Sequence, residues 1–402
     1  MPDSSPPSYW LATGPRLDTP ATLPKRAQVV VLGGGVFGVS AALFLARTGA
    51  NVLVLEQRRL SGGATGRNAG IVAPGTTQSY LTLGETAGWD TARQVWQFTE
   101  DSAALLKRVL AEEGVQAEQR VEGAHTVAMT PAEVETQQRT IERLAADGFE
   151  LAWLDRDALQ AHVGLPLPPA FLGARFHPRG MILHSARLVV GLAQAAQRYG
   201  AELRQGVRVL SIGAGKVETD QGTVRADHIV LATNAYTGRL IPALASVIIP
   251  TRGQMRSTVP LPQRVFRGSW SANEGGEYWQ QTLDGSWTLG GMRRRAADAE
   301  VGYLTDDLNG VVQAALDAFA GQHFPDLAAA PVSHRWAGSM GFTPDQRPLI
   351  GPLRPGLWIA AGCSGHGMPF ATEAGRQIAG WIRHGQPDRD MTPFDPHRFL
   401  QG

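Results

Sequence analysis

The stretch QVVVLGGGVFGVSAALFLARTGANVLVLEQ, residues 28–57, decides the fold of the N-terminal part of the chain. Its first apolar run, Val29–Leu32, is rich in β-branched residues and predicts a strand buried on both faces of a parallel sheet. Small and apolar residues at helical spacing follow from Val36 to Arg47, and Val52–Leu55 reads as a second buried strand. The stretch therefore predicts a β-α-β unit with a glycine-rich turn before its helix.

Three glycines in this turn, Gly33, Gly35 and Gly38, have the spacing G-x-G-x-x-G. In this context they permit a tight turn, a close approach to a pyrophosphate and close packing of the helix on the strand. Glu56 ends the second strand, where an acid accepts hydrogen bonds from ribose hydroxyls and disfavours a 2′-phosphate. The unit predicts a dinucleotide site and leaves FAD and NAD open. The alternative is a glycine turn that binds no ligand.

Composition narrows the class of protein. With 402 residues, 43% of them hydrophobic, the chain is long enough for two domains. A net charge of +1, with no basic run longer than Arg293–Arg295, disfavours nucleic acid as a partner. The single cysteine, Cys363, excludes an internal disulfide and a cysteine-based zinc cluster, and no metal site is predicted.

The same composition suggests where the protein works. No apolar stretch approaches the ~20 residues that a spanning helix needs, so no transmembrane segment is expected. The Pro/Ser-rich N-terminus lacks the apolar core of a signal peptide. We therefore expect a cytoplasmic protein with small-molecule partners. Nothing in the sequence indicates its oligomeric state.

Strand patterns divide the chain into alternating blocks. Buried-strand patterns recur at HIVLATNA, residues 228–235, and at LWIAAG, residues 357–362, where a glycine-rich turn and a helix follow. Alternating strands between about 247 and 291 predict an antiparallel sheet. We expect a nucleotide-binding domain built from residues 1–90, 170–245 and 336–402, and a substrate-binding domain built from residues 91–169 and 246–335.

A loop of small residues, SGGATGRNAG at 61–70, could wrap a ribityl chain and a ring system. At this point the chain resembles the flavin-dependent D-amino-acid oxidase superfamily, in the branch of glycine and sarcosine oxidases, and within it the γ-glutamylputrescine oxidase-like proteins. The motifs that carry the resemblance come in the family's order and span nearly the whole chain: SYW (8–10), residues 29–56, GGATGRNAG (62–70), PTRGQ (250–254), WAGSMGFTPDQRPLIG (336–351) and WIAAGCSGHGMPF (358–370).

The resemblance implies an α/β fold. It would consist of a Rossmann-like FAD-binding domain of the glutathione-reductase type, with a parallel sheet plus β-meander, and an inserted antiparallel-sheet substrate domain. It also implies FAD as the cofactor. The implied cofactor-binding residues are Gly33, Gly35, Val36, Phe37, Gly38, Glu56, Gln57, Ala64, Thr65, Gly66, Arg67, Asn68, Ala69, Gly70, Val207, Ala232, Thr233, Asn234, Gly338, Gly365, His366, Gly367 and Met368.

Three positions depart from the family's pattern. Gly338 stands where some relatives carry the cysteine that binds flavin covalently, so non-covalent FAD is expected. Pro369 and Thr288 stand where sarcosine oxidases carry two lysines. Their absence makes sarcosine a poor substrate candidate and puts rapid reaction with oxygen in doubt.

Candidate catalytic residues are His366 and Arg67. A guanidinium can grip a carboxylate with two hydrogen bonds, so Arg252 is a candidate substrate ligand. Tyr278, Trp336 and Met340 are candidates for an apolar substrate wall. The alternatives are that the two arginines pair with a flavin phosphate or a surface acid, that backbone carbonyls satisfy His366, and that the aromatic residues belong to the core.

The resemblance implies a reaction class. An amine or amino acid would transfer a hydride to flavin N5 and give an imine, which water hydrolyses to an aldehyde or oxo acid, while oxygen reoxidises the flavin and gives hydrogen peroxide. The sequence shows no clear catalytic acid or base. The alternatives are an amine dehydrogenase that uses another acceptor, an NAD-linked dehydrogenase and a non-catalytic FAD-binding protein.

Overall fold

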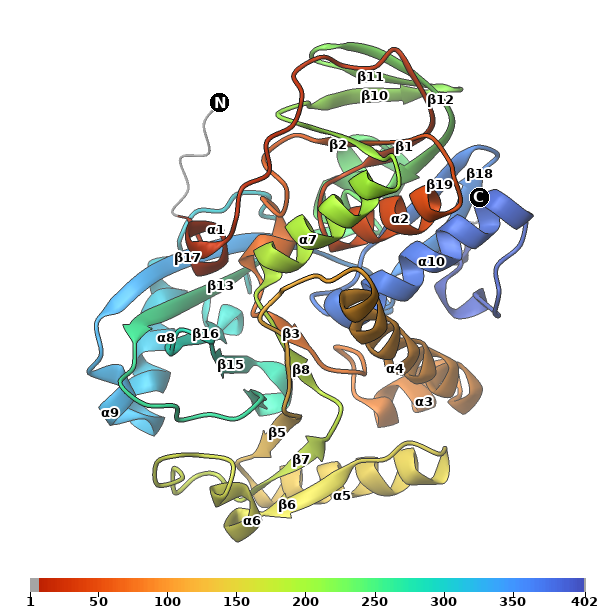
Figure 1. Ribbon diagram of the computed structural model, residues 1–402. Coiled ribbons are helices and arrows are strands. Elements are labelled where there is room, and N and C mark those ends of the chain that lie inside the picture. The colour runs from red at the N-terminus through yellow and green to blue at the C-terminus, as the bar shows by residue number, and fades with distance from the viewer. Residues whose placement is uncertain (1–6, 401–402) are drawn as a thin grey trace.

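The computed structural model describes residues 7–400, which form two large sheets with helices packed against them (Figure 1). In the first sheet, β19, β12, β1, β2 and β9 are parallel, and β10, β11 and β18 are antiparallel to their neighbours. The bounds are β1 (Arg26–Leu32), β2 (Val52–Glu56), β9 (Glu202–Gln205), β10 (Val209–Gly213), β11 (Lys216–Thr219), β12 (Gly222–Leu231), β18 (Leu349–Arg354) and β19 (Leu357–Ala361). A parallel sheet with a β-meander was expected, and the structure confirms it.

Three helices, α2 (Val36–Arg47), α7 (Ser185–Arg198) and α10 (Met368–His384), lie together on one face of this sheet (Figure 1). The long helix α4 (Trp89–Glu112) packs against α10, and its Phe98 ring contacts Phe370 and Phe394. One apolar cluster joins α2, α4, α7 and α10 to β1 and β2. Residues 91–113, expected in the substrate-binding part, therefore share a core with the nucleotide-binding elements.

The second sheet has the strand order β17-β13-β16-β15-β14-β5-β7-β6 and is antiparallel except between β14 and β5. Helix α8 (Gly310–His323) and the short α9 (Pro325–Ala328) pack on one of its faces around Trp279, Trp287 and Phe324. The bounds are β5 (Ala124–Ala128), β6 (Ala152–Asp155), β7 (Gly173–His177), β13 (Ile249–Pro260), β14 (Ser269–Ala272), β15 (Glu277–Gln281), β16 (Ser286–Gly291) and β17 (Val332–Phe342).

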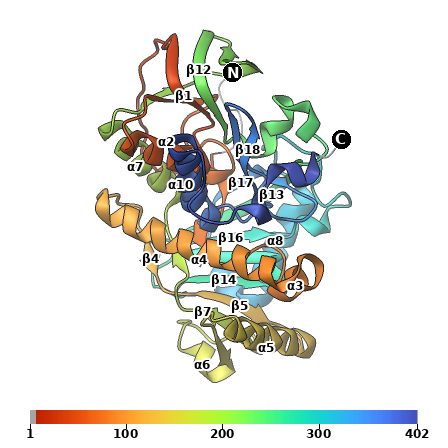
Figure 2. The ribbon, with the colours of Figure 1, turned by 90° about the vertical axis from the view of Figure 1, so that its right-hand side faces the viewer.

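Helices α3 (Tyr80–Ala87), α5 (Pro131–Ala146) and α6 (Arg156–Gln160) complete the lower part of the molecule, and α1 (Tyr9–Thr13) lies near the N-terminus. Figure 2 shows α4 between the upper helices α2 and α10 and the lower helix α5. A small sheet of β3 (Ile71–Val72), β8 (Met181–Ile182) and β4 (Arg120–Val121) lies between the two large ones (Figure 1). Within residues 7–400, no helix has the length and apolar character needed to cross a bilayer.

Sheet membership differs from the expected residue ranges at two places. Strands β7 and β17 belong to the antiparallel sheet, although residues 170–245 and 336–402 were expected in the nucleotide-binding part. The cause is tertiary, since β17 pairs with β13 along nearly its whole length, from Phe342 at Ile249 to Val332 at Thr258. The division of the chain into two domains stays a proposal.

Two buried histidines make the stability of this fold depend on pH. Burial lowers the pKa of His125 to about 3 and that of His184 to about 4 from an ordinary 6.5. The unfolded chain therefore takes up protons near that ordinary value while the folded protein does not, so the free energy of unfolding falls as the pH drops. Between about pH 7 and pH 5, we expect His125 to account for about 2 kcal/mol of this loss.

Urea unfolding at the two pH values measures the effect. The variant His125→Gln should be less stable than the wild type at neutral pH, because His125 Nδ1 donates to the carbonyl oxygen of Ser269 and Nε2 of the neutral ring accepts from His162 Nδ1. It should also lose less stability on acidification. An unchanged pH dependence in this variant would contradict the prediction.

Candidate functional site

A cavity of about 1000 Å³ lies where the two large sheets meet. On one side it is lined by the ends of parallel strands, with Leu32, Leu55 and Ala360 among the lining residues. On the other side it is lined by strands of the antiparallel sheet, through residues such as Thr126 and Tyr278. The C-terminal ends of parallel strands are where open α/β sheets bind their ligands.

Most of the predicted site residues line this cavity, although they come from distant parts of the chain. They are Gly33, Gly35, Val36, Phe37, Glu56, Gln57, Ala64, Thr65, Arg67, Asn68, Ala69, Val207, Ala232, Thr233, Asn234, Tyr278, Gly338, Met340, Gly365, His366, Gly367 and Met368. Five predicted residues are not among those that line it: Gly38, Gly66, Gly70, Arg252 and Trp336. These five residues lie elsewhere in the structure.

Two helices point their first turns at the cavity. Helix α2 starts after Gly35 and α10 starts after Gly367, and neither N-cap residue bonds to the first turn through a side chain. The N–H groups of a first turn carry partial positive charge and bind anions. Gly33 has φ +109°, and a Cβ on Gly38 would lie 1.9 Å from the carbonyl oxygen of Gly33. Glycine at these two positions lets α2 start directly against the turn.

Glu56 is held at the edge of the cavity by the backbone around it. Its carboxylate accepts hydrogen bonds from the N–H groups of Gly34 at 2.7 Å and Arg58 at 2.8 Å. Burial raises the pKa of Glu56, and these two donors oppose that effect. The carbonyl oxygen of Glu56 accepts from the N–H of Val207 at 3.0 Å, so two of the residues expected to bind the cofactor are neighbours.

Side-chain hydrogen bonds hold the loop around η1 (Ala64–Arg67) on the side away from the cavity. Its successive carbonyl oxygens, on Gly66, Arg67, Asn68 and Ala69, accept hydrogen bonds from Ser8 Oγ, Trp336 Nε1, Trp10 Nε1 and Gln280 Nε2. The donors come from three distant segments of the chain. They fix the loop while leaving Ala64, Thr65 and Arg67 to line the cavity.

This arrangement changes the role predicted for Trp336. Its side chain is fully buried, and its indole N–H donates to the carbonyl of Arg67 at 2.9 Å, so it supports the loop and does not contact the cavity. Gly70 lies behind the same loop at φ +67°, where a Cβ would meet the carbonyl oxygen of Leu183 at 2.3 Å. The N-terminal SYW motif has the same supporting role, through Ser8 and Trp10.

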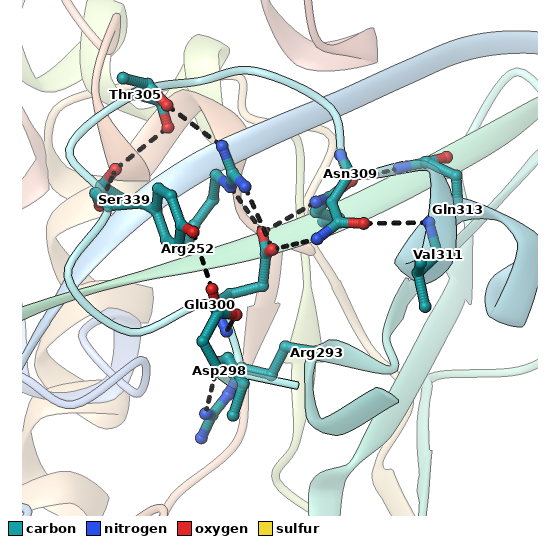
Figure 3. A network of polar contacts seen from close by, with 12 residues as sticks. Arg252, Arg293, Asp298, Glu300, Thr305, Asn309, Val311, Gln313 and Ser339 are labelled. Atoms are coloured by element: carbon teal, nitrogen blue, oxygen red, sulfur yellow. Dashed lines mark hydrogen bonds and ion pairs between the residues drawn. The ribbon is translucent and has the colours of Figure 1, made fainter. Parts of the chain in front are cut away.

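Arg252 also lies away from the cavity, in the polar network of Figure 3. Its Nε and Nη2 donate to the carboxylate of Glu300 at 2.5 and 3.1 Å, and its Nη1 donates to Thr305 Oγ1 at 3.1 Å. Gln254 and Asn309 also donate to Glu300, which is fully buried. Because the guanidinium of Arg252 is paired with a buried carboxylate, it is not available to a substrate. The substrate-binding role predicted for Arg252 therefore does not fit. The network instead fixes the segment from 298 to 309.

That segment contributes a residue that sequence reasoning missed. The carboxylate of Asp306 forms ion pairs with Arg58 and with Arg67, the latter at 3.4 Å. Arg67 is almost fully buried and also donates to the carbonyl oxygens of Gly62 and Ala337, both at 3.2 Å. Asp306 lies in a loop that carries no motif, so only the tertiary structure shows that it neutralises two arginines at the cavity.

His366 lines the cavity, but its imidazole is hydrogen-bonded to the backbone. Its Nε2 lies 2.9 Å from the carbonyl oxygen of Ala73, which can only accept, so Nε2 carries the proton. Burial lowers the pKa of His366, which keeps the imidazole neutral. The neighbouring thiol of Cys363 is buried, and its pKa rises to about 11, so it carries no thiolate at neutral pH.

The comparison with known families decides the identity of the cofactor. Residues 28–381 match the family described as FAD dependent oxidoreductase, DAO. The chain belongs to this family of FAD-dependent oxidoreductases. Its similarity to gamma-glutamylputrescine oxidoreductase of Escherichia coli (strain K12) is 28% identity, over 98% of this chain and 93% of that protein. The probable oxidoreductase OrdL of Rhizobium meliloti (strain 1021) is also 28% identical, over 92% of this chain and 87% of that protein.

Solved structures show the same fold for this oxidoreductase. L-proline dehydrogenase from P. horikoshii superposes with a TM-score of 0.78 at 24% identity, covering 94% of this chain and 99% of that one. Glycine oxidase from Geobacillus kaustophilus also gives a TM-score of 0.78, at 22% identity, over 92% and 98% of the two chains. These likenesses confirm the predicted fold class.

The residues present in the cavity fit FAD. The first turn of α2 would bind the pyrophosphate, and Glu56 would accept hydrogen bonds from the adenosine ribose. The loop at 62–70 would hold the flavin side, and the first turn of α10 would face negative charge on its ring system. A side chain at Gly338 would place Cβ 2.8 Å from Cβ of Arg67, so this position cannot hold a cysteine without moving Arg67.

Proposed function

We propose that this oxidoreductase oxidises the C–N bond of an amine or amino acid to an imine, which water hydrolyses to an aldehyde or oxo acid. FAD, when bound without a covalent link, supplies the acceptor for the hydride that leaves the carbon next to nitrogen. The substrates in the names of gamma-glutamylputrescine oxidoreductase, L-proline dehydrogenase and glycine oxidase support this reaction class.

One observation carries the proposal. A single cavity runs from the glycine-rich turn and Glu56 to Tyr278, Met340 and Gly365. A cofactor held at the first end and a substrate held at the second would therefore meet without a protein wall between them. When the cofactor carries the chemistry, holding two reactants together in one site is a major contribution of the protein.

The chain's own residues would orient and stabilise the reactants. The first turn of α10 would stabilise negative charge that develops at the edge of the flavin. Neutral His366 places no positive charge beside an incoming amine. Tyr278 and Met340 give the substrate an apolar wall.

An anaerobic reduction experiment tests the reaction class. Purified holoenzyme is mixed with primary amines, secondary amines and amino acids in the absence of oxygen, and the visible flavin absorbance is followed. We expect at least one class of amine to bleach the flavin and to release an aldehyde or oxo acid. If no amine or amino acid reduces the flavin of a protein loaded with FAD, the proposed reaction is rejected.

A second candidate is an amine dehydrogenase that transfers electrons to an acceptor other than oxygen. Thr288 favours it, because this residue is fully buried and donates to the carbonyl of Gln280, so it presents no cation at the position where sarcosine oxidases carry a lysine. Hydrogen peroxide formed per substrate in air, compared with turnover of an artificial electron acceptor, separates the two candidates.

A further inference from the structure

Arg175 on β7 is a cation in the cavity that has no acidic partner. Its Nη2 contacts Thr126 Oγ1 at 3.4 Å, and within residues 7–400 no carboxylate lies at ion-pair distance from it. This differs from Arg67 and Arg252, whose guanidinium groups meet Asp306 and Glu300. Arg175 is only partly buried and lines the cavity, so its guanidinium is accessible there to an anion that the chain does not supply.

The surroundings of Arg175 contain no compensating charge. Desolvation by the surrounding protein lowers the pKa of Arg175 to about 10, and no charged neighbour contributes to the shift. The group therefore stays protonated at neutral pH. Its own backbone N–H is satisfied by the side chain of Gln137 on α5 at 3.1 Å, which ties this part of the strand to the helix that covers it.

The register of the antiparallel sheet places Arg175 in a row of cavity-lining residues. Arg175 is opposite Thr126, Thr126 is opposite Ser271, and Ser271 is opposite Tyr278. Residues directly opposite each other on neighbouring strands project from the same face of a sheet. All four line the cavity, so the row forms a floor that runs from β15 to β7.

The other end of the row lies beside the flavin end of the cavity. A Cβ on Gly253 would lie 2.8 Å from Met340 Cε and 3.7 Å from Tyr278 Oη. A Cβ on Gly365, in the loop before α10, would lie 3.3 Å from Met340 Sδ. Tyr278 is therefore next to the residues expected at the flavin, and Arg175 is three strands away from it. At ~4.8 Å per strand, their backbones are about 14 Å apart.

We propose that Arg175 binds the carboxylate of an elongated substrate whose amine lies beside Tyr278 and Met340. This proposal rests on the proposed amine oxidation and adds the substrate class: an amine that carries a carboxylate at the far end of a long chain. A short amino acid such as glycine cannot reach both ends of the floor. Ser271 and Thr126 offer hydroxyl groups for polar atoms in the middle of the chain.

Two matched series of probes test the proposal on the holoenzyme. The first runs through ω-amino carboxylates from 4-aminobutanoate to 11-aminoundecanoate, and the second contains n-alkylamines of the same lengths. Anaerobic flavin reduction gives an apparent Kd and a limiting rate constant for each probe. For the wild type, we expect the apparent Kd of the amino carboxylates to fall with length to an optimum at which the chain spans the floor.

Arg175→Gln should raise the apparent Kd of the optimal amino carboxylate on the order of 100-fold. It should leave its limiting rate constant and all alkylamine values unchanged. Arg175→Lys should recover part of the affinity, because it restores the charge without the planar fork. FAD content and urea unfolding of both variants check that they fold. Arg293→Gln is the comparison variant, since Arg293 lines the cavity near Tyr278 and stacks on Phe342.

Two outcomes overturn the proposal. The first is that Arg175→Gln changes the apparent Kd of both probe series equally. The second is that Arg293→Gln loses the preference for amino carboxylates while Arg175→Gln keeps it. Calorimetric binding of the optimal probe to the oxidised holoenzyme separates this proposal from the reaction class. Binding that depends on Arg175 without flavin reduction would reject the proposed reaction and support the anion site. Absence of both binding and reduction would reject both.

Discussion

Gly38→Ala is expected to abolish tight FAD binding. The added Cβ would lie 1.9 Å from the carbonyl oxygen of Gly33, and backbone atoms cannot yield as a flexible side chain can. The start of α2 would have to move away from β1, and its N–H groups would move with it. We expect the apparent Kd for FAD to rise on the order of 100-fold or more, because a small displacement removes several hydrogen bonds to the pyrophosphate at once. Fluorescence titration of the apoprotein with FAD measures this.

Gly321→Ala is the matched control. Gly321 lies within α8, and a Cβ there meets nothing within 4 Å. Both changes replace glycine by alanine inside a helix, and alanine by itself favours a helix by ~0.5–1 kcal/mol. FAD binding should be unchanged in Gly321→Ala. Retention of wild-type FAD affinity by Gly38→Ala would show that α2 can move without harm to the site.

Asp306→Asn is expected to lower the free energy of unfolding by about 3 kcal/mol. The change keeps the shape of the side chain and removes the negative charge that faces Arg58 and Arg67. Arg67 would stay buried with less compensation for its charge, and breaking a buried ion pair from one side is strongly destabilising. Urea unfolding of the holoenzyme measures the change, and FAD retention after gel filtration should decrease with it.

Asp227→Asn is the control for loss of a carboxylate in an ion pair. Asp227 meets Arg26 at 2.9 Å, but both side chains are more than half exposed. Solvent already screens such a pair, so its loss should change stability little. If Asp306→Asn were as stable as Asp227→Asn, the carbonyl groups of Gly62 and Ala337 would be sufficient to hold Arg67.

Local sequence was enough to predict the βαβ unit and the glycine-rich turn that lines the cavity. The glycine turn, the start of α2 and Glu56 lie within one β-α-β unit, so their spacing along the chain fixes their spacing in space. The second glycine-rich turn, before α10, is a unit of the same kind. In such units, the sequence motif by itself predicts the local geometry.

Predictions that depended on side-chain partners succeeded less well. Arg252 and Trp336 sit in motifs shared with the family, but the strands that carry them point these side chains at Glu300 and at the Arg67 carbonyl. Residue type indicates what a group can bind and not which partner it meets. Asp306 and Arg175 had no motif at all, because the first lies in a loop and the second on an ordinary strand.

The sequence by itself determined that this chain has a βαβ unit with a glycine-rich turn, a second glycine turn at its far end and an antiparallel block between them. These features depend on backbone conformation and hydrophobic period, which are encoded within short stretches. Only the tertiary structure decided which charges are neutralised inside the protein and which are left for a ligand. That decision depends on pairing between strands and loops far apart in the chain, which gave Arg67 and Arg252 their carboxylates and left Arg175 facing the cavity without one.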